Sequence, residues 1–197
     1  MCGIVGIYLK TKKFEKNLGK MLSGMLNNME SRGPDSAGFA IYKNEGNKIY
    51  KFSLCINNLN FNIFKKELSK KIKKIKLNQI SDHVILKTEE KPKKILEILN
   101  LNFPEVSIVG YGKSIEIFKQ VGNPKDVVKK FKLADFTGTH GIGHTRMATE
   151  SAITTDGSHP YSTGEDECLV HNGSLSNHNN LRSCLLYTSD AADDGLS

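Results

Sequence analysis

A cysteine follows the initiator methionine directly at the start of the chain. If Met1 is removed, Cys2 carries both a thiol and a free α-amine. An α-amine has an unperturbed pKa of about 7.7–8.0, so part of it is neutral near pH 7 and can take the thiol proton, directly or through one water. Cys2 could then act as a nucleophile without a histidine base. The alternative is a small, buried cysteine at a strand edge.

Two later segments offer groups that could assist such a nucleophile. The segment GIGHTRMATES at 141–151 contains Arg146, one of only three arginines, and a guanidinium suits bidentate binding of a carboxylate. The segment HNG at 171–173 offers the side-chain amide of Asn172 and the backbone N–H of Gly173, a good donor pair for a developing oxyanion. The alternatives are a surface arginine and an ordinary Asn-Gly turn between strands.

A third segment, SRGPDSAG at 31–38, places Arg32, Gly33 and Asp35 in a tight loop. Its glycines let the backbone adopt a close turn, and it brings one cation and one carboxylate together. Plain turn chemistry explains the same residues equally well.

The surrounding pattern predicts the elements that would position these groups. The apolar run at 3–7 predicts a buried strand that holds Cys2 in place. Apolar residues at three- and four-residue steps predict an amphipathic helix over 14–30, which Arg-Gly-Pro then ends. The runs at 39–42 and 50–54 predict the two strands of a hairpin.

Residues 57–132 lack such motifs and are interpreted as scaffold with an inserted helix and strand unit. The predicted elements are a helix at 61–75, a strand at 84–86, a helix at 93–101, a strand pair at 106–111 and 115–120, and a helix at 124–131. Beyond them, a short buried strand at 168–170 leads into the HNG segment, and a helix is expected to start near 174.

The segment GYGKS at 110–114 suggests a phosphate-binding loop, but the interpretation is rejected. The pattern G-x-x-x-x-G-K-[ST] requires glycine where Ser107 stands, and the residues after Ser114 predict a strand rather than a helix.

Composition favours one globular domain of 197 residues, with 38% hydrophobic and 25% charged residues. The net charge of +7 comes from lysine rather than arginine, without a nucleic-acid-binding module, so no nucleic-acid partner is expected. No apolar run approaches the ~18–20 residues of a membrane span, and the N-terminus lacks a secretory pattern. The expectation is therefore a cytoplasmic protein without a membrane partner.

No metal site and no cofactor are predicted. His140 and His144 are four residues apart, but the glycines between them disfavour a helix that would align them. The cysteines have wide spacings without a C-x-x-C pair, which argues against a zinc knuckle and against a disulfide framework. They are Cys2, Cys55, Cys168 and Cys184.

The order of the motifs MCGIVGI, SRGPDSAG, GIGHTRMATES, SHPYS and CLVHNGSLSNHNNLR resembles the glutaminase domain of class II glutamine amidotransferases, over about 1–56 and 135–182. The resemblance implies an α+β fold, a four-layer αββα sandwich of antiparallel sheets, known as the N-terminal nucleophile hydrolase fold. It also implies hydrolysis of glutamine to glutamate and ammonia through a thioester on the N-terminal cysteine. No cofactor is implied.

The resemblance assigns a role to each matching residue. Cys2 would be the nucleophile with its own α-amine as base, and Arg146 would hold the substrate α-carboxylate, with Thr149 nearby as a polar contact. Asn172 and Gly173 would form the oxyanion hole. The loop beside the nucleophile would be shaped by Arg32, Gly33 and Asp35.

Within the family, RGPDSAG, the ATES after Arg146 and the long 57–132 region look most like the amidotransferase subunit or domain allied to glutamate synthase and N-methylglutamate synthase. Amidophosphoribosyltransferase and glucosamine-6-phosphate synthase are alternatives within the family. In each case ammonia would pass to a partner synthase domain or subunit. A different alternative is a catalytically silent module that binds glutamine or docks a partner.

The family pattern ends near residue 182. The text at 183–197 does not match it, so residues 1–182 are expected to form the amidotransferase domain, truncated at its C-terminus. The family's carboxylate for the substrate α-amino group would lie in the missing part. Asp190, Asp193 and Asp194 stand in the wrong context for that role.

Overall fold

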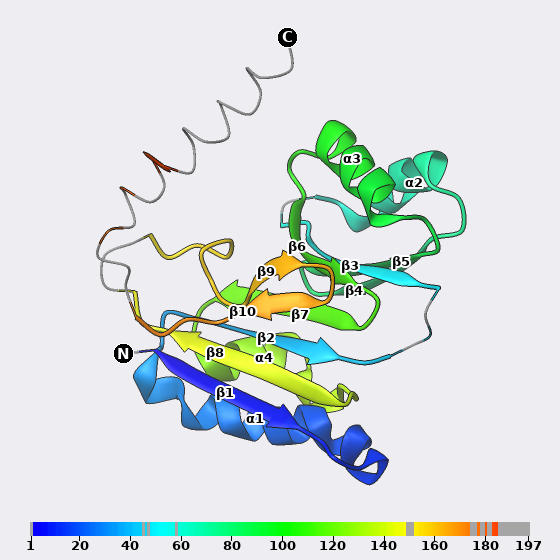
Figure 1. Cartoon of the computed structure of the whole chain (residues 1–197). Helices are drawn as coiled ribbons and strands as arrows, with labels where there is room; N and C mark the ends of the chain where they lie inside the picture. Colours follow the sequence, from blue (N-terminus) through cyan, green and yellow to red (C-terminus); the bar gives the residue numbers. More distant parts are fainter. Residues whose placement is uncertain are drawn as a thin grey trace.

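The computed structural model describes residues 2–44, 46, 48–57, 59–148, 152–173, 177, 180, 183 and 184. Two four-stranded antiparallel sheets dominate it (Figure 1). Sheet A has the strand order β1 (Gly3–Tyr8), β8 (His140–Arg146), β2 (Ser36–Tyr42) and β7 (Ile115–Val121). Sheet B has the order β4 (Lys76–Ile80), β5 (His83–Thr88), β3 (Tyr50–Cys55) and β6 (Ser107–Gly112).

Helices cover the outer face of each sheet, which gives four layers (Figure 1). Sheet A is covered by α1 (Leu18–Asn28) and α4 (Pro124–Lys130), and sheet B by α2 (Phe61–Lys71) and α3 (Pro92–Asn102). Short 3₁₀ helices lie at Lys12–Asn17, Glu30–Arg32 and Leu133–Asp135. The predicted αββα sandwich of antiparallel sheets is confirmed.

Three apolar clusters correspond to the three interfaces between these layers. Leu22 and Leu26 of α1 pack on Phe39 of β2 below sheet A. Ala40 of β2 and Ile117 of β7 contribute to the cluster between the sheets. A third cluster joins sheet B to α2 and α3, and its buried members include Phe52, Leu54, Phe64, Leu68, Ile95 and Leu99. Because β2 alternates its side chains between two faces, one strand serves two clusters.

Local sequence sets the helix starts. Asn60 accepts hydrogen bonds from the backbone N–H groups of Asn62 and Ile63 at the start of α2, and Asn123 accepts one from Lys125 at the start of α4. A proline occupies the first turn of α3 and of α4, where its missing N–H has no helical partner to lose. Within the described part of the chain, none of the helices has the length and apolar character that a membrane crossing needs.

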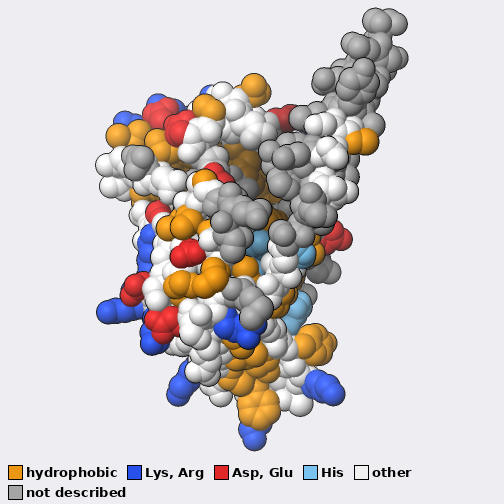
Figure 2. Space-filling view, turned by 90° about the vertical axis from the view of Figure 1, so that its left-hand side faces the viewer, with side chains coloured by type: hydrophobic (Ala, Val, Ile, Leu, Met, Phe, Trp, Pro, Cys, Tyr) orange, Lys and Arg blue, Asp and Glu red, His pale blue; other side chains and the backbone are white. Residues whose placement is uncertain are grey.

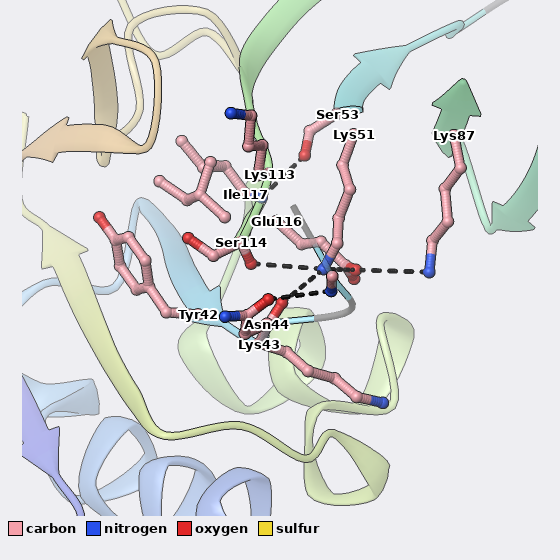
Figure 3. Close-up of polar contacts among 12 residues, drawn as sticks. Tyr42, Lys43, Asn44, Lys51, Ser53, Lys87, Lys113, Ser114, Glu116 and Ile117 are labelled. Atoms are coloured by element: carbon pink, nitrogen blue, oxygen red, sulfur yellow. Dashed lines mark hydrogen bonds and ion pairs between the residues drawn. The ribbon is translucent and has the colours of Figure 1, made fainter. Parts of the chain in front are cut away.

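A buried lysine connects the two sheets. The side chain of Lys51, on β3, is 0% exposed, and its ammonium donates to the carbonyl oxygens of Lys43 and Ser114 and to Glu116 Oε1 at 3.0 Å (Figure 3). Glu116 belongs to β7 of sheet A, and Lys87 of β5 approaches the same carboxylate oxygen at 4.0 Å. Three acceptors satisfy the three ammonium protons, which explains how a charge is tolerated there.

Several predicted elements exist but pair differently. The strands at 39–42 and 50–54 are not a hairpin, because β2 lies in sheet A and β3 in sheet B. The strands at 106–111 and 115–120 are likewise split between β6 and β7. Strand patterns fix which residues face a core, whereas the partner of each strand depends on long-range packing. The strand expected at 50–54 exists as β3.

Two further predictions need correction, and one strand was not predicted. The helix expected over 14–30 starts and ends in 3₁₀ turns, and only Leu18–Asn28 is α-helical. The edge strand β4 was not predicted, since its residues KLNQI are mostly polar. The strand expected to be buried at 168–170 is β10 (Glu167–Leu169), which pairs with β9 (Tyr161–Gly164) and leaves Leu169 54% exposed. The helix expected from 174 falls mainly outside the described residues.

Candidate active site

The N-terminal strand brings Cys2 to the end of β8. Strand β1 pairs antiparallel with β8 in a register that sets Gly3 opposite Thr145. The residue before β1 therefore lies beside the residue that follows β8, and Cys2 Sγ lies 3.9 Å from the carbonyl oxygen of Met147. Cys2 is half-buried, so its thiol is held by the sheet while remaining open to solvent.

The HNG segment reaches the same point from the other end of the chain. The side-chain amide of Asn172 donates to the backbone carbonyl of Cys2, with an Nδ2 to O distance of 2.9 Å. Asn172 and Gly173 are both exposed. The Asn172 amide, one of the two expected donors, thus lies next to the expected nucleophile across a sequence separation of 170 residues.

The loop before β2 packs against the end of β8 from the other side. Gly33 is buried, and a Cβ atom there would collide with the backbone of Thr145 and Arg146, so this close approach needs glycine. Asp35 Oδ2 accepts the backbone N–H of Ala148 at 2.7 Å, and the Asp35 N–H donates to the carbonyl of Arg146 at 3.1 Å. These contacts fix the chain where it leaves β8. Arg32, by contrast, has an exposed side chain.

Arg146 is the last residue of β8 and is half-buried. Its Nη1 donates to the carbonyl oxygens of Gly157, at 3.0 Å, and of Ala152, at 3.4 Å. The guanidinium therefore holds the turn at 152–157 beside the end of the sheet. Thr149, the other residue expected to contact substrate, lies outside the described residues.

Histidines near the site form a second layer of contacts that the sequence did not reveal. The Nε2 of His144 lies 2.9 Å from the carbonyl oxygen of His171, so Nε2 carries the proton and donates. The imidazole of His144 stacks on that of His159 with ring centroids 4.2 Å apart. In Figure 2, which views the face at the left of Figure 1, histidine side chains appear among hydrophobic ones. His144 had been considered only as a metal ligand.

Burial keeps this histidine pair neutral. Burial lowers the pKa of His144, against the hydrogen bond to His171 that raises it. Burial, with smaller contributions from His144, Arg146 and Lys119, lowers the pKa of His159 to about 3. The Nδ1 atoms of both rings are buried without a hydrogen-bond partner among the described residues. Neutral imidazoles suit a position next to the cationic Arg146.

The segment GYGKS at 110–114, which was rejected as a phosphate-binding loop, lies at the carboxylate of Asp166. The backbone N–H groups of Lys113, Ser114 and Ile115 and the Ser114 hydroxyl all donate to Asp166, at 2.7 to 3.0 Å. Burial alone would raise the pKa of Asp166, but these hydrogen bonds outweigh it and lower the pKa. A Cβ at Gly112 would collide with the same carboxylate. Asp166 thereby anchors the β9–β10 hairpin that leads into HNG.

A cavity of about 500 Å³ lies away from this site. It opens beside the edge strand β4, and its walls include Lys43, Lys87, Glu116 and Lys130. Cys2, Arg146 and Asn172 do not line it. The geometry of the hydrogen bonds, rather than this cavity, therefore marks the candidate active site.

Comparison with known proteins shows which families the chain is similar to. No protein-family profile matches the chain. The glutamine amidotransferase-like protein GlxB of Rhizobium meliloti (strain 1021) is 48% identical over 185 residues, which cover 92% of this chain and 62% of that protein. A glutamine amidotransferase candidate of Methanothermobacter thermautotrophicus is 29% identical over 206 residues, which cover 92% of this chain and 64% of that protein.

A third relative matches a shorter part. The glutamine–fructose-6-phosphate aminotransferase (isomerizing) of Methanococcus maripaludis is 40% identical over 74 residues, which cover 37% of this chain and 12% of that protein. The chain spans less than two thirds of the length of each of these curated relatives. The sequence likeness and the meeting of the motifs around Cys2 identify the chain as a relative of the class II glutamine amidotransferases.

Proposed function

We propose that this chain is the glutaminase domain of a class II glutamine amidotransferase, formed by residues 1–182, with 57–132 as a variable scaffold region and 183–197 as a non-matching tail. One observation carries the proposal: Asn172 bonds to the backbone of Cys2 at 2.9 Å, so the expected nucleophile and oxyanion donor share one site. In the reaction, the Asn172 amide would turn from this carbonyl to the oxyanion that forms on the substrate carbon bonded to the Cys2 sulfur.

The proposed reaction uses the N-terminal residue as nucleophile and base. The thiol of Cys2 gives its proton to the α-amine, and the sulfur attacks the side-chain amide carbon of glutamine. Asn172 and Gly173 stabilise the resulting oxyanion. The carbon–nitrogen bond breaks as the proton passes to nitrogen, which leaves as ammonia. Water then hydrolyses the thioester, and glutamate leaves with the thiol restored.

The test combines mass spectrometry of the N-terminus with an assay of ammonia release. We expect Met1 to be absent, glutamine to be hydrolysed, and a diazoketone analogue of glutamine to label Cys2. Cys2→Ala should abolish turnover and labelling. The matched control is Cys168→Ala, because burial raises the pKa of the Cys168 thiol and makes it a poor nucleophile. A retained Met1, or turnover by Cys2→Ala, would remove the mechanism.

Arg146 is proposed to bind the substrate α-carboxylate, with Thr149 as a nearby polar contact. The support is its position at the end of β8, one residue before the carbonyl that the Cys2 thiol approaches. Because Arg146 also holds the 152–157 turn, loss of activity alone would not separate the two roles. We expect Arg146→Lys to raise KM for glutamine but to change KM little for glutaminamide, which lacks the α-carboxylate. An equal change for both substrates would assign Arg146 to the turn alone.

The proposed ammonia acceptor is a synthase domain or subunit of the glutamate synthase type. The support is the RGPDSAG loop, the ATES segment and the long 57–132 region, together with the contrast between a match over 92% of the chain to GlxB and one over 37% to the aminotransferase.

A reduced N-terminal thiol suits the cytoplasm, where we expect the protein to act. Tight glutamine binding without turnover would instead favour a silent binding module.

A further inference from the structure

A second cluster of reactive side chains lies where sheet B faces sheet A. Cys55 ends β3 and His83 begins β5, and the register of these strands sets the two residues directly opposite each other. Asp82 precedes His83 in the turn from β4. One ligand-type atom from each of Cys55, Asp82 and His83 lies within 4.8 Å of the others. Strand pairing, rather than sequence spacing, brings them together.

The cluster is removed from water and incompletely satisfied. Cys55 is 1% exposed and His83 is 0% exposed. The Nδ1 of His83 lies 3.0 Å from Asp82 Oδ1, but its Nε2 is buried without a hydrogen-bond partner among the described residues. A buried imidazole nitrogen without a partner is costly, and it indicates a missing ligand or water.

Lys130 orients the Asp82 carboxylate within the cluster. Lys130 Nζ binds Asp82 Oδ2 at 2.8 Å, which leaves Oδ1 on the side of His83 and Cys55. Burial raises the pKa of the Cys55 thiol, so its proton leaves only as the metal binds.

We propose that Cys55, Asp82 and His83 bind one zinc ion that fastens β3 to the β4–β5 turn. A sulfur, nitrogen and oxygen ligand set is one that Zn²⁺ accepts, whereas Mg²⁺ and Ca²⁺ prefer oxygen. Zinc bonds of about 2.0–2.3 Å set tetrahedral ligand atoms about 3.2–3.8 Å apart, so small side-chain rotations close the present spacing. On binding, Cys55 loses its thiol proton to solvent.

A fourth ligand position is available beside the thiol. Cys55 Sγ lies 3.1 Å from Oδ1 of Asn57, close to the separation expected of neighbouring zinc ligands. Either this amide oxygen or a water completes the coordination. The site is structural in this proposal and is independent of glutamine hydrolysis.

The test is a cobalt titration of the full, metal-free chain, followed by zinc. We expect one equivalent of Co²⁺ to produce a thiolate-to-cobalt charge-transfer band that zinc abolishes, and zinc to raise Tm. Cys55→Ser and His83→Gln should lose the band and the Tm increase. Cys168→Ser, the matched control at another partly buried cysteine, should keep both. Absence of the band in the unaltered chain, or its survival in Cys55→Ser, would overturn the proposal.

A second measurement covers the case in which the Cys55 or His83 variants fail to fold. X-ray absorption at the zinc edge of the unaltered, zinc-loaded chain should reveal one sulfur ligand with nitrogen and oxygen ligands. A spectrum with only nitrogen and oxygen ligands, or with several sulfurs, would contradict the site. Glutaminase activity is measured alongside, and we expect Cys55→Ser to retain it, so the two proposals can fail separately.

Discussion

The Nε2 of His144 donates to the backbone carbonyl of His171 across a distance of 2.9 Å, directly before the Asn-Gly pair of the candidate oxyanion hole. Because His144 lies in strand β8 of sheet A, this bond holds the exposed HNG segment in place against the sheet. Asn172 depends on that support because the residues around it are exposed.

His144→Phe should therefore lower kcat by up to about tenfold, since one neutral hydrogen bond is worth about 0.5–1.5 kcal/mol. KM for glutamine should change little, because the lost bond supports the segment that carries Asn172 rather than the Arg146 guanidinium. The measurement is steady-state glutaminase kinetics. His140→Phe is the matched control: it makes the same change at the start of β8, where His140 stacks on Tyr42, and it should leave kcat unchanged.

Asn172→Ala tests the oxyanion role directly. Loss of one preorganised oxyanion donor lowers kcat by about 10²–10³-fold in comparable sites. Because Asn172 is exposed, the thermal unfolding curve should not move. Asn102→Ala, which removes another exposed amide that bonds within α3, should leave both measurements unchanged. A fully active Asn172→Ala variant would exclude this residue from the oxyanion hole.

Asp166→Ala should destabilise the chain by about 2–3 kcal/mol, because hydrogen bonds to a charged acceptor are lost and their donors are left partly buried. The effect should concentrate in the β9–β10 hairpin, which Asp166 fastens to the turn after β6. Chemical denaturation measures the change in the free energy of unfolding. Limited proteolysis within 161–169 measures the opening of the hairpin. Glu165→Ala changes an adjacent exposed side chain, so equal effects of the two substitutions would contradict the anchoring role.

The sequence predicted what depends on local pattern and on motif chemistry. The strand behind Cys2 and the helix starts near residue 93 and at Pro124 appear where the pattern predicts them, although β1 is an edge strand with alternate residues exposed rather than a buried strand. Each of these follows from side-chain periodicity or from backbone constraints that act within a few residues.

Contacts between residues that are distant in the sequence could not be predicted from these local patterns. Nothing local shows that β2 and β3 enter different sheets, or that Cys55 faces His83 across a strand pair. The bond from His144 to His171 depends on a loop path that periodicity does not describe. A partial signal existed at Gly112, whose lack of a side chain permits the close approach of Asp166.

The Lys51–Glu116 pair allows two substitutions to be compared: one removes the counter-ion of a buried charge, and the other removes the charge itself (Figure 3). Glu116→Ala should destabilise the chain by about 3–5 kcal/mol, because the buried ammonium of Lys51 loses its counter-ion. Lys51→Met should cost less, since it removes the charge and retains the apolar stem. Urea denaturation measures both. Glu67→Ala, which breaks the exposed pair with Lys70, should leave the free energy of unfolding nearly unchanged.

His159 should make stability fall on acidification. Its folded-state pKa is about 3, below the ordinary value of 6.5, so the unfolded chain binds a proton that the folded chain refuses between these values. The contribution of His159 is complete above about pH 6.5 and is lost progressively as the pH falls toward 3. The charged and titratable groups that act on it are Lys119, His144, Arg146 and His171.

His159→Phe should therefore flatten the decline in unfolding free energy between about pH 6.5 and 4.5, a window above the ordinary titration of aspartate and glutamate. Urea denaturation at several pH values gives the two slopes. Above pH 7 the difference between variant and parent should be constant, because neither the folded nor the unfolded histidine is then protonated. If the two slopes match below pH 6.5, His159 takes up its proton equally in both states and is not buried as the structure describes.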